Sequence, residues 1–189
     1  METKNSLFSS ALKSGLIIGA VSIVVFIIMY VADYKPVGIW MPMLIGLISL
    51  AINIVILVIL FKNYRTEIGG FISFRDAFLY CLVALIIATL LSTIFTFIFI
   101  QFIEPEYYKN IMEAQKTYME NYLSGKVSDE QMTQTLEKLD EQAAKMGSIA
   151  FTLKGLIYST VISGIIALII AAIMKKKHEM FDNNTGGVI

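Results

Sequence analysis

Four long apolar blocks constrain this sequence more than any other feature. Hydrophobic residues make up 57% of the 189 residues, and most of them are gathered into these blocks. A transmembrane helix needs about 20 predominantly apolar residues. The blocks reach that length at Leu12–Tyr30, Trp40–Phe61, Ala77–Phe102 and Ile149–Met174. The three prolines fall at block edges, so the sequence predicts an all-α polytopic membrane protein with four transmembrane helices.

The blocks and the sequence between them predict four regions. Residues 1–104 carry transmembrane helices one to three, 105–148 form a helical hairpin, 149–174 form the fourth span, and 175–189 are a basic, disordered tail. A cleaved signal peptide is the competing interpretation of the first block. Its apolar run is too long for a signal peptide, and no small-residue cleavage site follows it.

Local capping patterns predict where helices begin. Ser73, followed three residues later by Asp76, is typical of a helix start at the third span, and Glu104-Pro105 ends that span. Ser128 with Gln131 is a capping box for the second hairpin helix, after a break at Ser124-Gly125. The sequence leaves open whether Gly147 breaks the helix there or the second hairpin helix runs on into the fourth span.

The distribution of basic residues predicts the orientation. Short loops on the cytoplasmic side are enriched in lysine and arginine. The two termini and the 62–75 loop carry eight such residues, against one in the short loop on the other side. Both termini are therefore predicted to be cytoplasmic. The hairpin, with nine acids and five lysines between 104 and 148, is predicted to be extracytoplasmic.

The hairpin has an amphipathic pattern with many tyrosines and methionines, residue types that are enriched at protein interfaces. It is interpreted either as a solvated connector or as a docking surface for a periplasmic partner or a second copy. Its acidic polar face argues against a helix lying flat on the leaflet. The surface candidates are Tyr107, Tyr118 and Tyr122.

Small residues repeat every four positions in two spans, a pattern that lets helices approach closely in a membrane. Within one bundle this serves internal packing; in the fourth span it could also serve self-association. Asn53 is the one strongly polar side chain deep in the second span and is expected to hydrogen-bond across helices. The helix-packing candidates are Gly15, Gly19, Asn53, Gly155, Ser159, Ser163, Ala167 and Ala171.

The sequence contains no recognisable catalytic, cofactor-binding or metal-binding constellation. No Asp, Glu, His or Arg lies in the middle of a span, where proton relays and ion pathways usually place one. Cys81 lies inside a span and His178 in the basic tail. The expectation is a protein without catalytic, cofactor or metal residues that is not an enzyme. A net charge of zero gives no indication of nucleic-acid binding.

GGFISFRDAF, Gly69–Phe78, followed by a span and then FIEPEYY, Phe102–Tyr108, resembles an uncharacterised bacterial four-span membrane family, domain of unknown function forty-one ninety-nine. Its members are similar in the order of the spans, the glycine pair before the third span and the acid-proline-acid exit. The Ser128–Gln131 turn is similar too. The resemblance implies an integral inner-membrane protein of Gram-negative bacteria. It implies no activity and no catalytic residues.

Two functions follow as hypotheses. The first is a non-enzymatic scaffold or accessory subunit whose partners are the lipid bilayer and either a second copy or another membrane or periplasmic protein. The alternative is a small transporter or channel component, with Asn53 and the polar row Thr89–Thr96 near its path.

Overall fold

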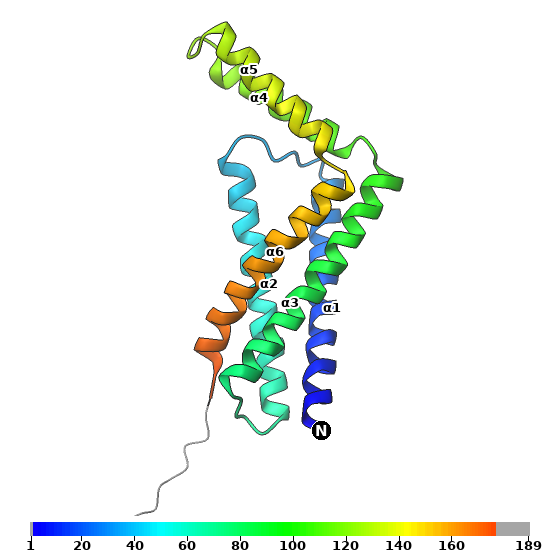
Figure 1. Ribbon diagram of the computed structural model, residues 1–189, viewed down its shortest axis with the longest axis vertical. Helices are drawn as coiled ribbons and strands as arrows, with labels where there is room; N and C mark the ends of the chain where they lie inside the picture. Colours follow the sequence, from blue (N-terminus) through cyan, green and yellow to red (C-terminus); the bar gives the residue numbers. More distant parts are fainter. Residues whose placement is uncertain (1, 177–189) are drawn as a thin grey trace, which may run out of the picture.

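The computed structural model describes residues 2–176, with side chains from Ser6 onward. This part of the chain is all-helical, as the sequence predicts (Figure 1). Of the predicted disordered tail, 175–189, residues 177–189 lie outside the described residues, whereas the backbone of Lys176 is hydrogen-bonded to that of Ile72. The elements are α1 Glu2–Val31, α2 Trp40–Glu67, α3 Phe74–Ile98, the π-helix η1 Phe99–Ile103, α4 Tyr107–Leu123, α5 Asp129–Lys145 and α6 Ile149–Met174.

Four helical segments are long and apolar enough to cross a membrane: Ser6–Val31, Trp40–Glu67, Phe74–Ile103 and Ile149–Met174. Their 26 to 30 residues extend over roughly 39–45 Å at 1.5 Å per residue, more than the ~30 Å of a bilayer's hydrocarbon core. Helix α1 begins ten residues before the predicted apolar block. Its extra turns are held by packing, since Leu7 and Ala11 are buried in the core.

The third span is the centre of the bundle, because α3 packs along α1, crosses α6 and also touches α2. The main core lies at one end, here called the base, where α1 begins, α2 ends, α3 begins and α6 ends (Figure 1). Leu57, Phe61, Tyr80, Cys81 and Ala167 are buried there. The first half of α2 is largely exposed, so the bundle is closed at the base and more open at the other end, here called the hairpin end.

The base is tied together by hydrogen bonds between segments distant in sequence. Ile72 N–H donates to the Lys176 carbonyl at 2.9 Å, and Lys176 N–H donates to the Ile72 carbonyl at 3.2 Å. The Arg65 guanidinium donates to the Met174 carbonyl at 2.9 Å. These bonds attach the end of α6 to the α2–α3 loop.

The predicted cap at Ser73 is confirmed, with one difference in detail. Its hydroxyl oxygen accepts from Asp76 N–H at 3.1 Å. The Asp76 carboxylate, however, accepts a hydrogen bond from the Ser73 hydroxyl at 2.8 Å and not from the backbone N–H of Ser73. The aspartate side chain is one carbon shorter than that of glutamate or glutamine, the usual residues at this position of a capping box.

The hairpin consists of α4 and α5, which pack mainly against each other and project beyond the bundle (Figure 1). The capping box predicted at Ser128 and Gln131 is present in full. Gly147, with a φ of 80°, separates α5 from α6, and the Ser148 hydroxyl caps α6 by accepting from Phe151 N–H. The second hairpin helix and the fourth span are therefore two helices, which settles the point that the sequence left open.

Candidate functional site

A cluster of aromatic rings joins the hairpin to the bundle. The Tyr30 ring lies 4.8 Å from Phe99 and 6.1 Å from Tyr107, measured between centroids, and Phe26 lies 5.2 Å from Phe99. Most of these pairs meet edge to face, the arrangement that the ring quadrupole favours. The cluster connects α1, η1 and α4, and so it fixes the first turn of the hairpin over the ends of two spans.

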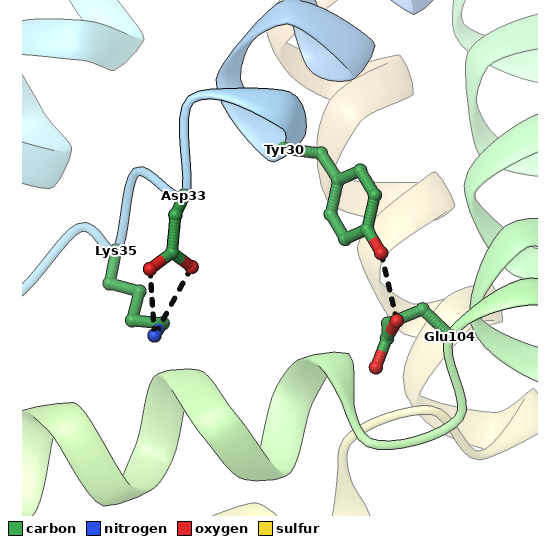
Figure 2. A network of polar contacts seen from close by, with 4 residues as sticks. All are labelled: Tyr30, Asp33, Lys35 and Glu104. Carbon is green, nitrogen blue, oxygen red and sulfur yellow. Dashed lines mark hydrogen bonds and ion pairs between the residues drawn. The ribbon is translucent and has the colours of Figure 1, made fainter.

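A polar network borders this aromatic cluster (Figure 2). The Tyr30 hydroxyl, at the end of α1, donates to Glu104 Oε2 at 2.8 Å, across 74 positions of sequence. The Lys35 ammonium contacts both carboxylate oxygens of Asp33, at 3.2 and 3.3 Å. Figure 2 shows Glu104 and the Asp33–Lys35 pair on either side of Tyr30, between the α1–α2 loop and the start of the hairpin.

These residues line a cavity of about 350 Å³. That volume lies near the lower end of the range for small-molecule sites, about 300–1,000 Å³. The cavity draws its walls from the end of α1, the α1–α2 loop, the residue after η1 and the first two turns of α4. Its lining is Tyr30, Val31, Asp33, Tyr34, Lys35, Glu104, Tyr107, Asn110 and Ile111.

Two tyrosines of the lining are held in protected environments. The Tyr34 hydroxyl is enclosed and has no hydrogen-bond partner among residues 2–176. Burial raises the pKa of the Tyr107 hydroxyl above its ordinary value, and the adjacent Tyr108 hydroxyl adds to this. Tyr107 therefore stays neutral at physiological pH, and the fixed charges of the cavity are those of Asp33, Lys35 and Glu104.

The three predicted hairpin surface residues lie in two different places. Tyr107 is half-buried in the aromatic cluster, whereas Tyr118 and Tyr122 lie farther along α4 and are 37% and 54% exposed. Their rings are stacked with centroids 6.0 Å apart, and the Lys126 ammonium lies 4.0 Å from the centre of the Tyr122 ring. Tyr118 and Tyr122 thus form an exposed aromatic surface near the hairpin tip.

The hairpin is also held to the loop between the first two spans. Gly38 N–H donates to the Gln115 side-chain oxygen at 2.7 Å. Gly38 has a φ of 77°, and a Cβ built on it would lie only 2.9 Å from the Tyr118 ring, so a larger residue has neither the conformation nor the space. An ion pair between Lys116 and Asp140 joins α4 to α5.

The small residues of the first span pack directly against the third. A Cβ on Gly15 would lie 2.6 Å from the Ala84 carbonyl oxygen, and one on Gly19 would lie 3.2 Å from that of Ala88. Next to them, the Ser14 and Tyr80 hydroxyls share a buried hydrogen bond of 2.6 Å. Glycine is required at Gly15 because the neighbouring helix backbone occupies the space of a side chain.

The small residues of the fourth span divide into two groups. Ser163, Ala167 and Ala171 are buried near the base. Gly155 and Ser159 instead line an open cleft of about 250 Å³ between α3 and α6, near the hairpin end. The α3 side of this cleft includes Ser92, Thr93 and Thr96. One periodic stripe therefore has two different surroundings, a packed one in one half of α6 and an open cleft in the other.

Asn53 lies elsewhere, on the α1 side of the bundle. Its side-chain oxygen accepts a hydrogen bond from the Ser22 hydroxyl at 3.1 Å. Asn53 is not among the residues that line the α3–α6 cleft, so the structure does not bring it together with the polar row Thr89–Thr96. Within residues 2–176 no group of three or more His, Cys, Asp or Glu side chains could hold a metal ion.

The cavity at the hairpin end was not predicted from the sequence. Tyr30, Tyr34 and Tyr107 are recognisable as interfacial aromatics, but their common cavity depends on the packing of α1 against η1. Glu104 carried a detectable signal, because it is the first ionisable residue after a span and precedes a proline. That pattern predicts the end of a helix and does not predict a hydrogen bond to a tyrosine in another span.

Comparison with known proteins supports the resemblance noted above. Neither the curated proteins nor the solved structures give a match. Residues 13–176 match the family described as protein of unknown function, DUF4199, and this segment contains all of the described bundle except the first turns of α1. The chain therefore belongs to the DUF4199 family.

Proposed function

We propose that this protein is a non-enzymatic scaffold or accessory subunit of the bacterial inner membrane, and that its extracytoplasmic hairpin binds another protein. The observation that carries the proposal is the exposed pair Tyr118 and Tyr122 on a hairpin that projects from the bundle (Figure 1). Tyrosine is enriched in interface cores because it contributes a large contact area together with a hydroxyl group. The basic residues near the base support an orientation with the hairpin outside the cytoplasm.

The position of the hairpin supports a binding role over that of a connector. A connector between η1 and α6 needs only a few residues, because the two segments approach each other where Gln101 donates to the Gly147 carbonyl at 3.0 Å. The chain instead forms two helices of 17 residues each. The capping box, the Lys116–Asp140 ion pair and the contact of Gly38 with Gln115 hold these helices in one orientation.

Site-specific photo-crosslinking tests the proposal. A photoreactive phenylalanine analogue at Tyr122 should give a discrete protein adduct in native membranes, and the same probe at the exposed Gln142 of α5 should not. Mass spectrometry of the adduct distinguishes a second copy from a different protein. Absence of any protein adduct at Tyr118 and Tyr122 would exclude a docking role for this surface.

A transporter or channel component is the second candidate, and the hydroxyl-lined α3–α6 cleft favours it. The test is the reactivity of single cysteines in a Cys81→Ala background, probed with a membrane-impermeant thiol reagent. A water-filled path along this cleft predicts labelling of both Thr96→Cys and Ser159→Cys, which line it from opposite sides. Protection of both positions would favour the scaffold.

A further inference from the structure

The cavity at the hairpin end lies at the level where lipid headgroups are expected. Two of its walls come from the ends of candidate spans, which finish at Val31 and Ile103. Tyr30 and Glu104 lie within one residue of those ends. The candidate spans extend over roughly 39–45 Å, comparable to the ~40–45 Å thickness of a bilayer with its headgroup layers included, so their ends reach the headgroup level. Helix α4 covers the cavity from the outer side with Tyr107, Asn110 and Ile111.

The charge of the lining favours a positively charged group. Asp33 and Glu104 carry negative charges and Lys35 a positive one, a net charge of −1. Glu104 uses Oε2 to accept from Tyr30, and in the described chain its Oε1 has no hydrogen-bond partner. The rings of Tyr30, Tyr34 and Tyr107 also line the cavity. A carboxylate among aromatic rings is the arrangement that binds ammonium groups, which are attracted to the ring faces.

The same cavity also offers groups for an anion. Lys35 is paired with Asp33, but the Asp33 side chain is 83% exposed. Exposed ion pairs contribute only about 0–1 kcal/mol, so a phosphate can take over the ammonium of Lys35. The Tyr34 hydroxyl is enclosed and has no hydrogen-bond partner within the described part of the chain, although such groups are nearly always hydrogen-bonded. Asn110 adds an amide that can donate to an anion.

We propose that this cavity binds an ammonium–phosphate zwitterion of the phosphoethanolamine class, as carried by the headgroup of a membrane lipid. Glu104 and the tyrosine rings contact the ammonium. Lys35 contacts the phosphate together with the Tyr34 hydroxyl, which becomes accessible when the Tyr34 ring turns. A divalent cation fits less well, since residues 2–176 hold no cluster of three candidate ligands. This site is separate from the Tyr118–Tyr122 surface, so the two proposals can fail independently.

Lipid retention by the purified full-length protein tests this site. Native mass spectrometry compares bound phosphatidylethanolamine with phosphatidylglycerol of the same acyl chains. The expected result is a preference of about tenfold for phosphatidylethanolamine, the effect of one charge-assisted hydrogen bond. Glu104→Gln should abolish this preference, because it removes the charge while its amide oxygen can still accept from Tyr30. The matched control is Glu106→Gln, an exposed residue paired with Lys109, which should keep the preference.

A second variant and a soluble competitor make the test specific. Tyr34→Phe keeps the ring and removes the unpartnered hydroxyl, so it should lower retention of phosphatidylethanolamine by roughly fivefold. If free phosphoethanolamine displaces the lipid, the cavity recognises the same headgroup chemistry from a soluble source. If the lipid stays bound, the source is the membrane lipid itself. Equal retention of both lipids by the wild-type protein, or identical behaviour of Glu104→Gln and Glu106→Gln, would overturn the proposal.

Discussion

Single residues decide how closely the first and third spans approach. Gly15 and Gly19 face α3 at the Ala84 and Ala88 carbonyls and at the side chains of Ile87 and Leu91, so at these two positions the helices meet without a side chain from α1. In a membrane, where lipid tails are as apolar as the protein, such packing is a main source of helix association. The buried hydrogen bond between Ser14 and Tyr80 lies beside this contact and satisfies both hydroxyls.

The first prediction concerns Gly15. Gly15→Ala places a methyl group where the Ala84 carbonyl oxygen would be 2.6 Å away, so α1 and α3 must move apart. We expect a loss of about 1–3 kcal/mol in the free energy of unfolding, as is typical of overpacking. Unfolding in mixed micelles by a denaturing detergent measures this loss.

The control for this prediction is Gly46→Ala, also within a helix. No atom lies within 4 Å of a Cβ at Gly46, and alanine favours helix over glycine by up to about 1 kcal/mol. This variant should be neutral or more stable. Equal destabilisation by the two substitutions would show that the α1–α3 contact has no special requirement at Gly15.

The sequence predicted the small-residue stripes but could not predict what each faces. Periodicity identifies one side of a helix and contains no information about its partner. The stripe of α6 shows the consequence, because Ala167 is buried while Gly155 lies beside an open cleft. That difference arises from the way α3 and α6 pack along their length, which depends on many side chains at once.

At the scale of the elements, local chemistry predicted helix starts well. The caps at Ser73 and Ser128 form as expected because each depends on residues within one turn. Helix α1 begins before the apolar block at Leu12–Tyr30, because its first turns are held by Leu7 and Ala11 in the core. The cavity around Glu104 escaped prediction for a similar reason, since it combines segments more than 70 positions apart.

The second prediction concerns the attachment of the hairpin at high pH. Burial raises the pKa of the Tyr107 and Tyr108 hydroxyls, so the folded hairpin favours their neutral forms. Their contribution to stability is complete below the unfolded pKa near 10 and is lost as the pH rises through the raised values. The protection of the first turns of α4 against hydrogen exchange, relative to an unfolded chain at the same pH, should therefore fall above about pH 10.

Paired substitutions separate this effect from general alkaline unfolding. Tyr107→Phe combined with Tyr108→Phe should preserve protection of these turns to higher pH, because neither ring can then ionise. Tyr118→Phe combined with Tyr122→Phe removes two tyrosines near the tip and should behave as the wild type. If both double variants lose protection at the same pH, ionisation of Tyr107 and Tyr108 is not the cause.

At the scale of the whole molecule, the bundle is closed at the base and open at the hairpin end. The base carries the main core and the hydrogen bonds of Arg65 and Ile72 to the end of α6. The hairpin end carries the aromatic cluster, the cavity and the α3–α6 cleft. Basic residues near the base support its placement on the cytoplasmic side.

The third prediction tests this orientation. A reporter that is active only in the periplasm should be active when inserted at Gly125, in the turn between α4 and α5, and inactive when fused after Lys176. Gly125 has open space around it and a φ of 73°, so an insertion there disturbs little packing. The reverse pattern of activity would place the hairpin in the cytoplasm.

The two ends of the hairpin are joined to different spans, η1 through Glu104-Pro105 and α6 through Gly147. Those two spans are joined at the base, where Ile72 bonds to Lys176, and again at the hairpin end, where Gln101 donates to the Gly147 carbonyl, and the α3–α6 cleft lies between these joins. A partner that pulls or twists the hairpin would therefore act on the Gln101–Gly147 contact and change the width of the α3–α6 cleft. Force applied in the aqueous phase would in this way reach a cleft between two membrane spans without any span having to slide.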